Sequence, residues 1–129
     1  MYAKVTQNIP IPDTGSVRED LYQILQQLFI VLTATTTATA VTELIAEAQI
    51  NSHFPEASRE GFIQCYRAAI GTILERGIVR GELRSNLNLE LVIDAIYGSV
   101  WYRLLLKHPP LDDTFAEELV SFLIAGISA

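Results

Sequence analysis

The stretch LELVIDAIYGSVWYRLLL, residues 89–106, constrains the fold of this chain most strongly. Placed on a helix at about 100° per residue, it shows two apolar sides. One side carries Leu89, Ile93, Ile96, Tyr97, Val100 and Leu104. The roughly opposite side carries Leu91, Ala95, Gly98, Tyr102 and Leu105. A surface helix normally has one apolar stripe, so this helix requires two partners. We expect one partner to be the core of the chain and the other a second subunit.

Helical periodicity continues through most of the sequence. Apolar residues recur at spacings of three and four, and no segment alternates with a period of two. The pattern predicts helices at 17–32, 37–50, 55–80, 89–106 and 113–127. The expected fold is therefore an all-α, five-helix bundle with short connections. Residues 1–16 are expected to form an extended lead, because Pro10 and Pro12 oppose a helix, and residues 17–129 to form one helical domain.

Capping residues mark several predicted helix ends. Ser16 and Glu19 have the spacing of a capping box, in which each side chain bonds the backbone N–H of the other residue. Asp112, Asp113 and Thr114 are candidate N-caps of the last helix, and Thr114 and Glu117 have the spacing of a second box. Asn88 is expected to cap the two-sided helix that follows it.

Composition and charge exclude several classes of protein. Among 129 residues, 50% are hydrophobic and 19% are charged, which predicts a folded domain rather than a disordered chain. The net charge of −6 and the scattered basic residues predict that this chain does not itself bind nucleic acid. No apolar run reaches the roughly 18 residues of a membrane span, and the N-terminus lacks the pattern of a signal peptide. The single cysteine permits no internal disulfide, so we expect a cytoplasmic protein.

Reactive and metal-binding chemistry has no clear motif in this sequence. His53 and His108 lie near predicted helix ends without a Cys or His at ligand spacing, so we expect neither a metal site nor a cofactor. No nucleophile or pair of carboxylates stands out, and we expect no catalytic residue. Asp94 lies between the two apolar sides of its helix, and burial there requires a partner such as Arg67 or Arg103.

Five segments, in this order and spacing, resemble the C-terminal domain of TetR-family transcriptional regulators. They are PDTGSVREDL (12–21), LIAEAQ (44–49), ILERGIVRGELR (73–84), YGSVWYRLL (97–105) and the stretch from Pro110 to Phe115. The resemblance covers about residues 12–127. It implies an effector-sensing and homodimerising domain whose last two helices pair with those of a second subunit. It also implies that DNA is bound only through an N-terminal helix-turn-helix domain, which the 16-residue lead is too short to contain. We therefore expect either a truncated regulator or a sequence that begins inside the protein.

Ligand contacts vary within this family, so residue chemistry alone indicates the candidate pocket. Effector pockets are mostly apolar with a few polar groups, and tyrosine and tryptophan supply both. The expected ligand-binding residues are Leu28, Phe29, Phe62, Cys65, Tyr66, Ala69, Tyr97, Trp101 and Leu104. The effector is expected to be a small apolar molecule. The competing interpretation is that these residues form an ordinary core.

The last two helices provide the candidate dimer interface, where small residues allow close approach of two helices. The expected interface residues are Leu91, Ala95, Gly98, Ser99, Tyr102, Leu119, Val120 and Leu123. The competing interpretation is an internal packing surface. Two other functions remain open: a free-standing dimeric interaction module without a ligand, and, less favoured, a small enzyme that uses the helical cavity.

Overall fold

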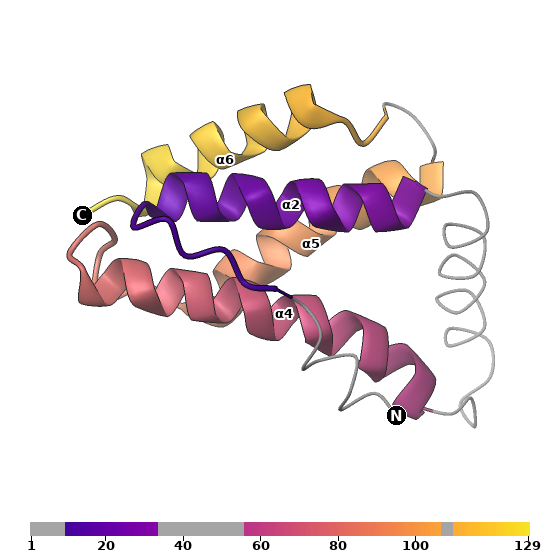
Figure 1. The fold of residues 1–129 in the computed structure, drawn as a ribbon, viewed down its shortest axis with the longest axis horizontal. Helices are drawn as coiled ribbons and strands as arrows, with labels where there is room; N and C mark the ends of the chain where they lie inside the picture. The colour runs from indigo at the N-terminus through magenta and orange to yellow at the C-terminus, as the bar shows by residue number, and fades with distance from the viewer. Residues whose placement is uncertain (1–9, 34–55, 107–109) are drawn as a thin grey trace.

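The computed structural model describes residues 10–33, 56–106 and 110–129 (Figure 1). Within these ranges the chain forms four α-helices and no named strand. They are α2 (Val17–Thr33), α4 (Glu56–Val79), α5 (Leu89–Leu106) and α6 (Asp113–Ile127). The all-α class is confirmed, and each of these helices begins and ends within about a residue of its predicted bounds. The helix predicted at 37–50 lies outside the described residues, so the count of five stays a prediction.

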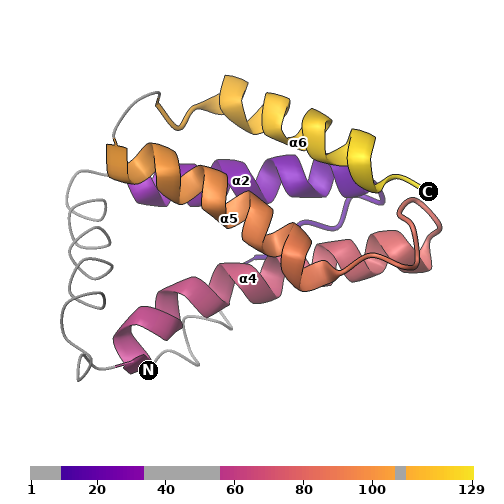
Figure 2. The ribbon, with the colours of Figure 1, turned by 180° about the vertical axis from the view of Figure 1, so that it is seen from behind.

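Helix α2 lies at the centre of the described structure. It packs against α4 and α6, and α4 packs in turn against α5. Figure 1 shows α2 between α6 and α4, and Figure 2 shows α5 crossing on the other side of the molecule. The central position follows from a wide apolar stripe, which buries Val17, Leu21, Ile24, Leu25, Leu28, Phe29 and Leu32. None of the described helices is both long and apolar enough to cross a membrane.

The capping box predicted at the start of α2 is half formed, whereas the cap predicted at the start of α5 is fully formed. The Ser16 Oγ accepts a hydrogen bond from the Glu19 N–H at 3.3 Å, which is one half of the predicted capping box. The other half is missing, because the Ser16 N–H donates to the Thr14 Oγ1 at 3.3 Å instead. The Asn88 cap is confirmed, since its Oδ1 accepts from the Leu91 N–H at 3.2 Å.

The prediction of a capping box at the start of α6 was wrong. Of the three N-cap candidates, the structure selects Asp112, whose Oδ1 accepts from the Phe115 N–H at 2.9 Å. Asp112 has the extended backbone that a cap requires, whereas Thr114 already lies inside the helix. A carboxylate is also favoured at a helix N-terminus by the helix dipole, which explains why Asp112 takes this role.

The C-terminal end of α4 is fixed to the end of α6. Gly81 has a φ of 84°, and the Glu82 N–H donates to the Gly77 carbonyl at 2.9 Å, as in a Schellman motif. The chain then forms an isolated antiparallel bridge between Leu83 and Ser128. This bridge holds the turn between α4 and α5 beside the C-terminus.

Candidate functional site

The structure brings together most of the residues predicted to bind a ligand. Those that are buried in the core are Leu28, Phe29, Cys65, Tyr66, Ala69, Tyr97 and Leu104. Trp101 is half-buried and packs against them. Phe62 falls on α4, but its side chain lies outside the described ones. These residues come from α2, α4 and α5, and we refer to them as the aromatic cluster. Its role as a pocket stays a prediction, because an ordinary core would place the same residues together.

Two phenols give the aromatic cluster its polar character. The Tyr97 ring lies 5.6 Å from that of Trp101, measured between ring centroids. Burial, and secondarily the charged form of Tyr66, raises the pKa of Tyr97. Burial also raises the pKa of Tyr66, with a smaller contribution from Cys65. A tyrosine hydroxyl is neutral at physiological pH even in water, and burial favours the neutral form of both phenols further.

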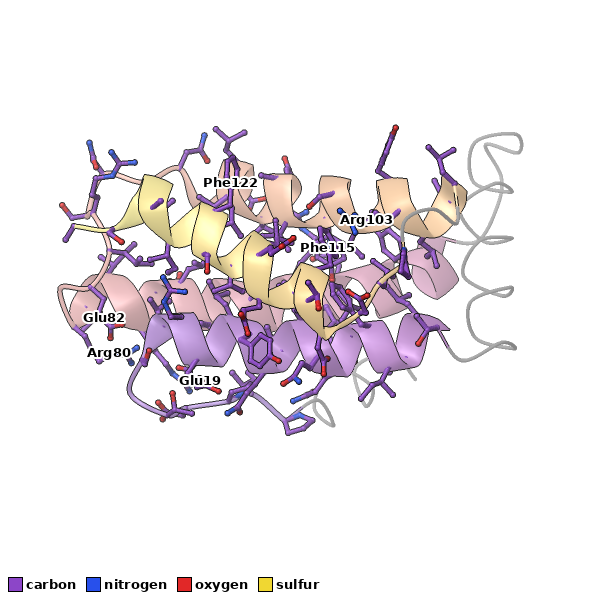
Figure 3. The ribbon with its side chains drawn as sticks, turned by 90° about the horizontal axis from the view of Figure 1, so that it is seen from above. Glu19, Arg80, Glu82, Arg103, Phe115 and Phe122 are labelled. Carbon is purple, nitrogen blue, oxygen red and sulfur yellow. The ribbon has the colours of Figure 1, made fainter. Side chains whose placement is uncertain are left out.

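A stack of three side chains joins three helices and includes one member of the aromatic cluster, Phe29. Phe29 of α2 and Phe115 of α6 lie nearly parallel, with centroids 5.7 Å apart and planes inclined by 8°. The guanidinium carbon of Arg103, from α5, lies 3.6 Å from the centre of the Phe115 ring (Figure 3). Such a cation–π contact contributes about 0.5–1 kcal/mol at an exposed site and more when it is desolvated. Arg103 is therefore engaged with Phe115, which leaves Arg67 as the partner of Asp94.

Arg67 ties α4 to α5 at the edge of the aromatic cluster. Its guanidinium donates to the Asp94 Oδ1 at 2.9 Å and to the Glu90 Oε1 at 2.6 Å. Asp94 is exposed rather than buried between the two sides of its helix. A mostly polar hollow of about 250 Å³ lies beside this contact and is lined by none of the predicted ligand residues. No group of three potential metal ligands occurs in the described part of the chain.

Helix α5 has the two sides that the sequence predicts. Ile93, Ile96, Tyr97, Val100 and Leu104 are buried on the inner side, together with Val92. On the outer side, the side chains of Leu91 and Tyr102 are 63% and 64% exposed, and Ala95 and Gly98 are exposed between them. The Ser99 hydroxyl donates to the backbone carbonyls of its own helix at 3.0 and 3.1 Å. The outer side of α5 is therefore a large apolar surface with no unsatisfied polar group at Ser99.

Of the three α6 residues that were predicted at the dimer interface, only Leu119 is partly exposed. Val120 and Leu123 are buried in the core of the chain, and Leu119 is half-buried. Phe122, which the sequence did not place in the interface, is 78% exposed. Figure 3 shows Phe122 on the side of α6 along which α5 runs. We define the α5–α6 face by its exposed apolar members: Leu91, Ala95, Gly98, Tyr102, Leu105, Leu106 and Phe122.

Phe122 could not have been found from the periodicity alone. It lies seven residues after Phe115, so the two rings project from the same side of the helix. Phe115 is buried because Phe29 and Arg103 cover it, whereas Phe122 has no such neighbours. The exposure of Phe122 therefore follows from the tertiary arrangement of the helices and not from a pattern in the sequence.

Comparison with known proteins agrees with this geometry. The family described as "Tetracyclin repressor-like, C-terminal domain" matches residues 11–123. The chain is 37% identical over 124 residues to an uncharacterized HTH-type transcriptional regulator, YdeS, of Bacillus subtilis (strain 168), a match that covers 96% of this chain and 62% of the relative. It is 28% identical over 128 residues to the HTH-type transcriptional regulator AqdR of Rhodococcus erythropolis, covering 98% of this chain and 60% of the relative.

A solved structure shows the same fold. The TetR family transcription regulator SCO0332 superposes with a TM-score of 0.84 and 32% sequence identity, over 97% of this chain and 69% of that one. The chain spans about three fifths of the length of the curated relatives that it matches. The family match extends over most of the sequence, and identity to one of the regulators exceeds a third. The chain therefore belongs to the TetR family of transcriptional regulators and corresponds to the C-terminal domain of that family.

Proposed function

We propose that this chain is the dimerising and effector-sensing part of a TetR-like regulator, and that DNA is bound by a helix-turn-helix segment outside it. The chain matches only 62% and 60% of two relatives whose names describe them as HTH-type regulators. Its net charge of −6 also opposes contact with phosphates. The proposal assigns sensing to the aromatic cluster and dimerisation to the α5–α6 face.

The exposed α5–α6 face is the observation that carries the proposal. Monomeric soluble proteins rarely leave a large contiguous apolar surface open to water, and such surfaces usually mark an interface. Ala95 and Gly98, near the middle of this face, leave room for a second helix to approach closely. A second copy of the chain presents the same surface, so a two-fold arrangement covers both faces at once.

Gly98 supports an external contact for a separate reason. A Cβ atom added to this residue would meet no atom within 4 Å, so packing inside the chain does not require a glycine. Glycine in a helix interior is nonetheless less favourable than alanine by about 1 kcal/mol. Close approach of a partner helix accounts for a glycine at this position.

Sedimentation velocity of the purified chain tests the dimer. We expect a dimer at micromolar concentration, and a monomer with unchanged helicity for Gly98→Glu, because the added side chain is free to point away from its own core. A wild-type chain that remains monomeric throughout the micromolar range would contradict the proposal. Val79→Glu is a suitable control, since Val79 is 86% exposed at the end of α4 and lies outside the α5–α6 face.

Effector binding can be followed with the only tryptophan. Trp101 lies beside Tyr97 in the aromatic cluster, so a bound molecule is expected to change its fluorescence. A panel of small uncharged apolar compounds would be titrated, and a true effector should also raise the Tm. Tyr97→Phe should weaken binding by removing one hydroxyl, whereas Tyr22→Phe, outside the cluster, should not. If no compound changes the Trp101 signal or the Tm while the dimer persists, the effector-free dimeric module becomes the better function.

A further inference from the structure

The segment 10–16, which we call the strap, is fastened to both α2 and α4. The Gln27 side chain of α2 donates to the Pro10 carbonyl at 3.4 Å. The Arg76 guanidinium of α4 donates to the Pro12 carbonyl at 3.3 Å. Figure 1 shows the strap running from the start of α2 across to α4. The strap is therefore held to two helices at separate points along its length.

Asp20 is the innermost of these attachment points. Its side chain is 0% exposed, and it is the only charged residue among the buried ones described. The Oδ1 atom accepts hydrogen bonds from both the N–H and the Oγ1 of Thr14, each at 2.8 Å. The Oδ2 atom is buried and has no hydrogen-bond partner among the described residues. The Oδ1 atom thus accepts two hydrogen bonds from the strap, whereas Oδ2 accepts none from the described residues.

Stability alone does not explain a carboxylate in this environment. A buried charged group with an unsatisfied oxygen is unfavourable, and an apolar residue of similar size in such a place is often neutral or stabilising. The contacts that Asp20 makes are contacts with the strap. Asp20 is therefore better explained by the position that it gives the strap than by a contribution to the stability of the core.

We infer that Asp20 is a positioning residue that latches the strap onto α2 and so fixes the direction of the chain from Pro10 to Ser16 as it enters the helix. The residue that follows the strap is also held, because the Val17 N–H donates to the Glu82 Oε1 at 2.8 Å. The start of α2 is thereby joined to the turn that follows α4.

A separate contact, from Arg76 of α4 to Pro12, connects the strap with the proposed sensing region. Helix α4 carries Tyr66 in the aromatic cluster and, farther along the same helix, Arg76 beneath the strap. A shift of α4 on effector binding would therefore move Tyr66 and Arg76 together, and with Arg76 the strap that it holds. This second role rests on the proposed function, whereas the latch itself does not.

Amide hydrogen exchange in the intact chain tests the latch through the Asp20→Leu variant. A hydrogen bond to a charged group contributes enough that its loss should speed exchange of the amide at position 14 by about tenfold or more. The urea midpoint, followed by Trp101 fluorescence, should stay the same or rise. Glu19→Leu changes a neighbouring, exposed carboxylate of the same turn and should leave exchange at position 14 unchanged.

Unchanged exchange at position 14 in folded Asp20→Leu would overturn the inference. If that variant does not fold, Asp20→Asn decides, because it keeps the size of the side chain and removes the charge from the acceptor of the Thr14 N–H. Faster exchange at position 14 in Asp20→Asn supports the latch, and unchanged exchange refutes it. Sedimentation of the same samples separates the two proposals: a normal dimer without a latch refutes only the inference, and a latched monomer refutes only the proposed dimer.

Discussion

Replacing Phe122 by alanine should weaken the proposed dimer by a predictable amount. Burying a whole phenylalanine side chain contributes about 1.5–3 kcal/mol. Because this residue is 78% exposed and open to a partner, burial of its ring contributes about 1.2–2.3 kcal/mol in each copy. A two-fold interface contains the residue twice, so the dimer should lose about 2–5 kcal/mol. The dissociation constant should therefore rise by roughly 30-fold to 3,000-fold.

Sedimentation equilibrium over a wide concentration range measures this change, and circular dichroism checks that the helices are intact. The matched control is Val79→Ala. Val79 is another large apolar residue, 86% exposed, but it lies at the end of α4 and outside the α5–α6 face. Its truncation should leave the dissociation constant within about threefold of the wild-type value, as expected for a surface change within about 0.5 kcal/mol.

The reasoning is refuted if the two variants behave alike. Equal weakening would mean that association depends on general surface hydrophobicity rather than on the α5–α6 face. Unchanged association in Phe122→Ala would mean that the partner covers another surface or that this part of α6 stays open to water.

Three further changes test the packing and the electrostatics. Gly98→Ala should stabilise the dilute monomer toward urea by about 1 kcal/mol through helix propensity, yet weaken the dimer in sedimentation if a partner helix approaches closely. Ile24→Ala, at a fully buried position in α2, should lower the free energy of unfolding by about 2–5 kcal/mol in urea titrations; a smaller loss would show that the core around α2 is loosely packed. The Val17 N–H and the Arg80 guanidinium lower the pKa of Glu82. Since the pKa is lower in the folded state, Glu82 stabilises above the unfolded value of about 4.3, and this contribution disappears as pH falls through the folded pKa. The stability difference between wild type and Glu82→Gln should be about 1 kcal/mol at pH 7 and vanish in acid; a difference that is independent of pH would contradict the assigned cause.

The sequence by itself determined the helices that the structure describes. Their bounds follow from apolar residues at spacings of three and four, which is a local property of a chain with 3.6 residues per turn. The two sides of α5 followed from the same rule, with Ile96 buried and Tyr102 exposed as expected. The Asn88 cap was equally predictable, because its acceptor lies three residues from the amide that it binds.

Only the tertiary structure decided which neighbour covers each side chain. Phe115 and Phe122 share one side of α6, but the chain supplies a stacking partner to the first alone. Val120 was predicted at the interface and is buried in the core instead. The hydrogen bonds between Thr14 and Asp20 were also not predicted from the sequence, which indicated only the Ser16 cap there. Periodicity specifies the direction in which a side chain leaves its helix, whereas the element that meets it depends on how the helices cross.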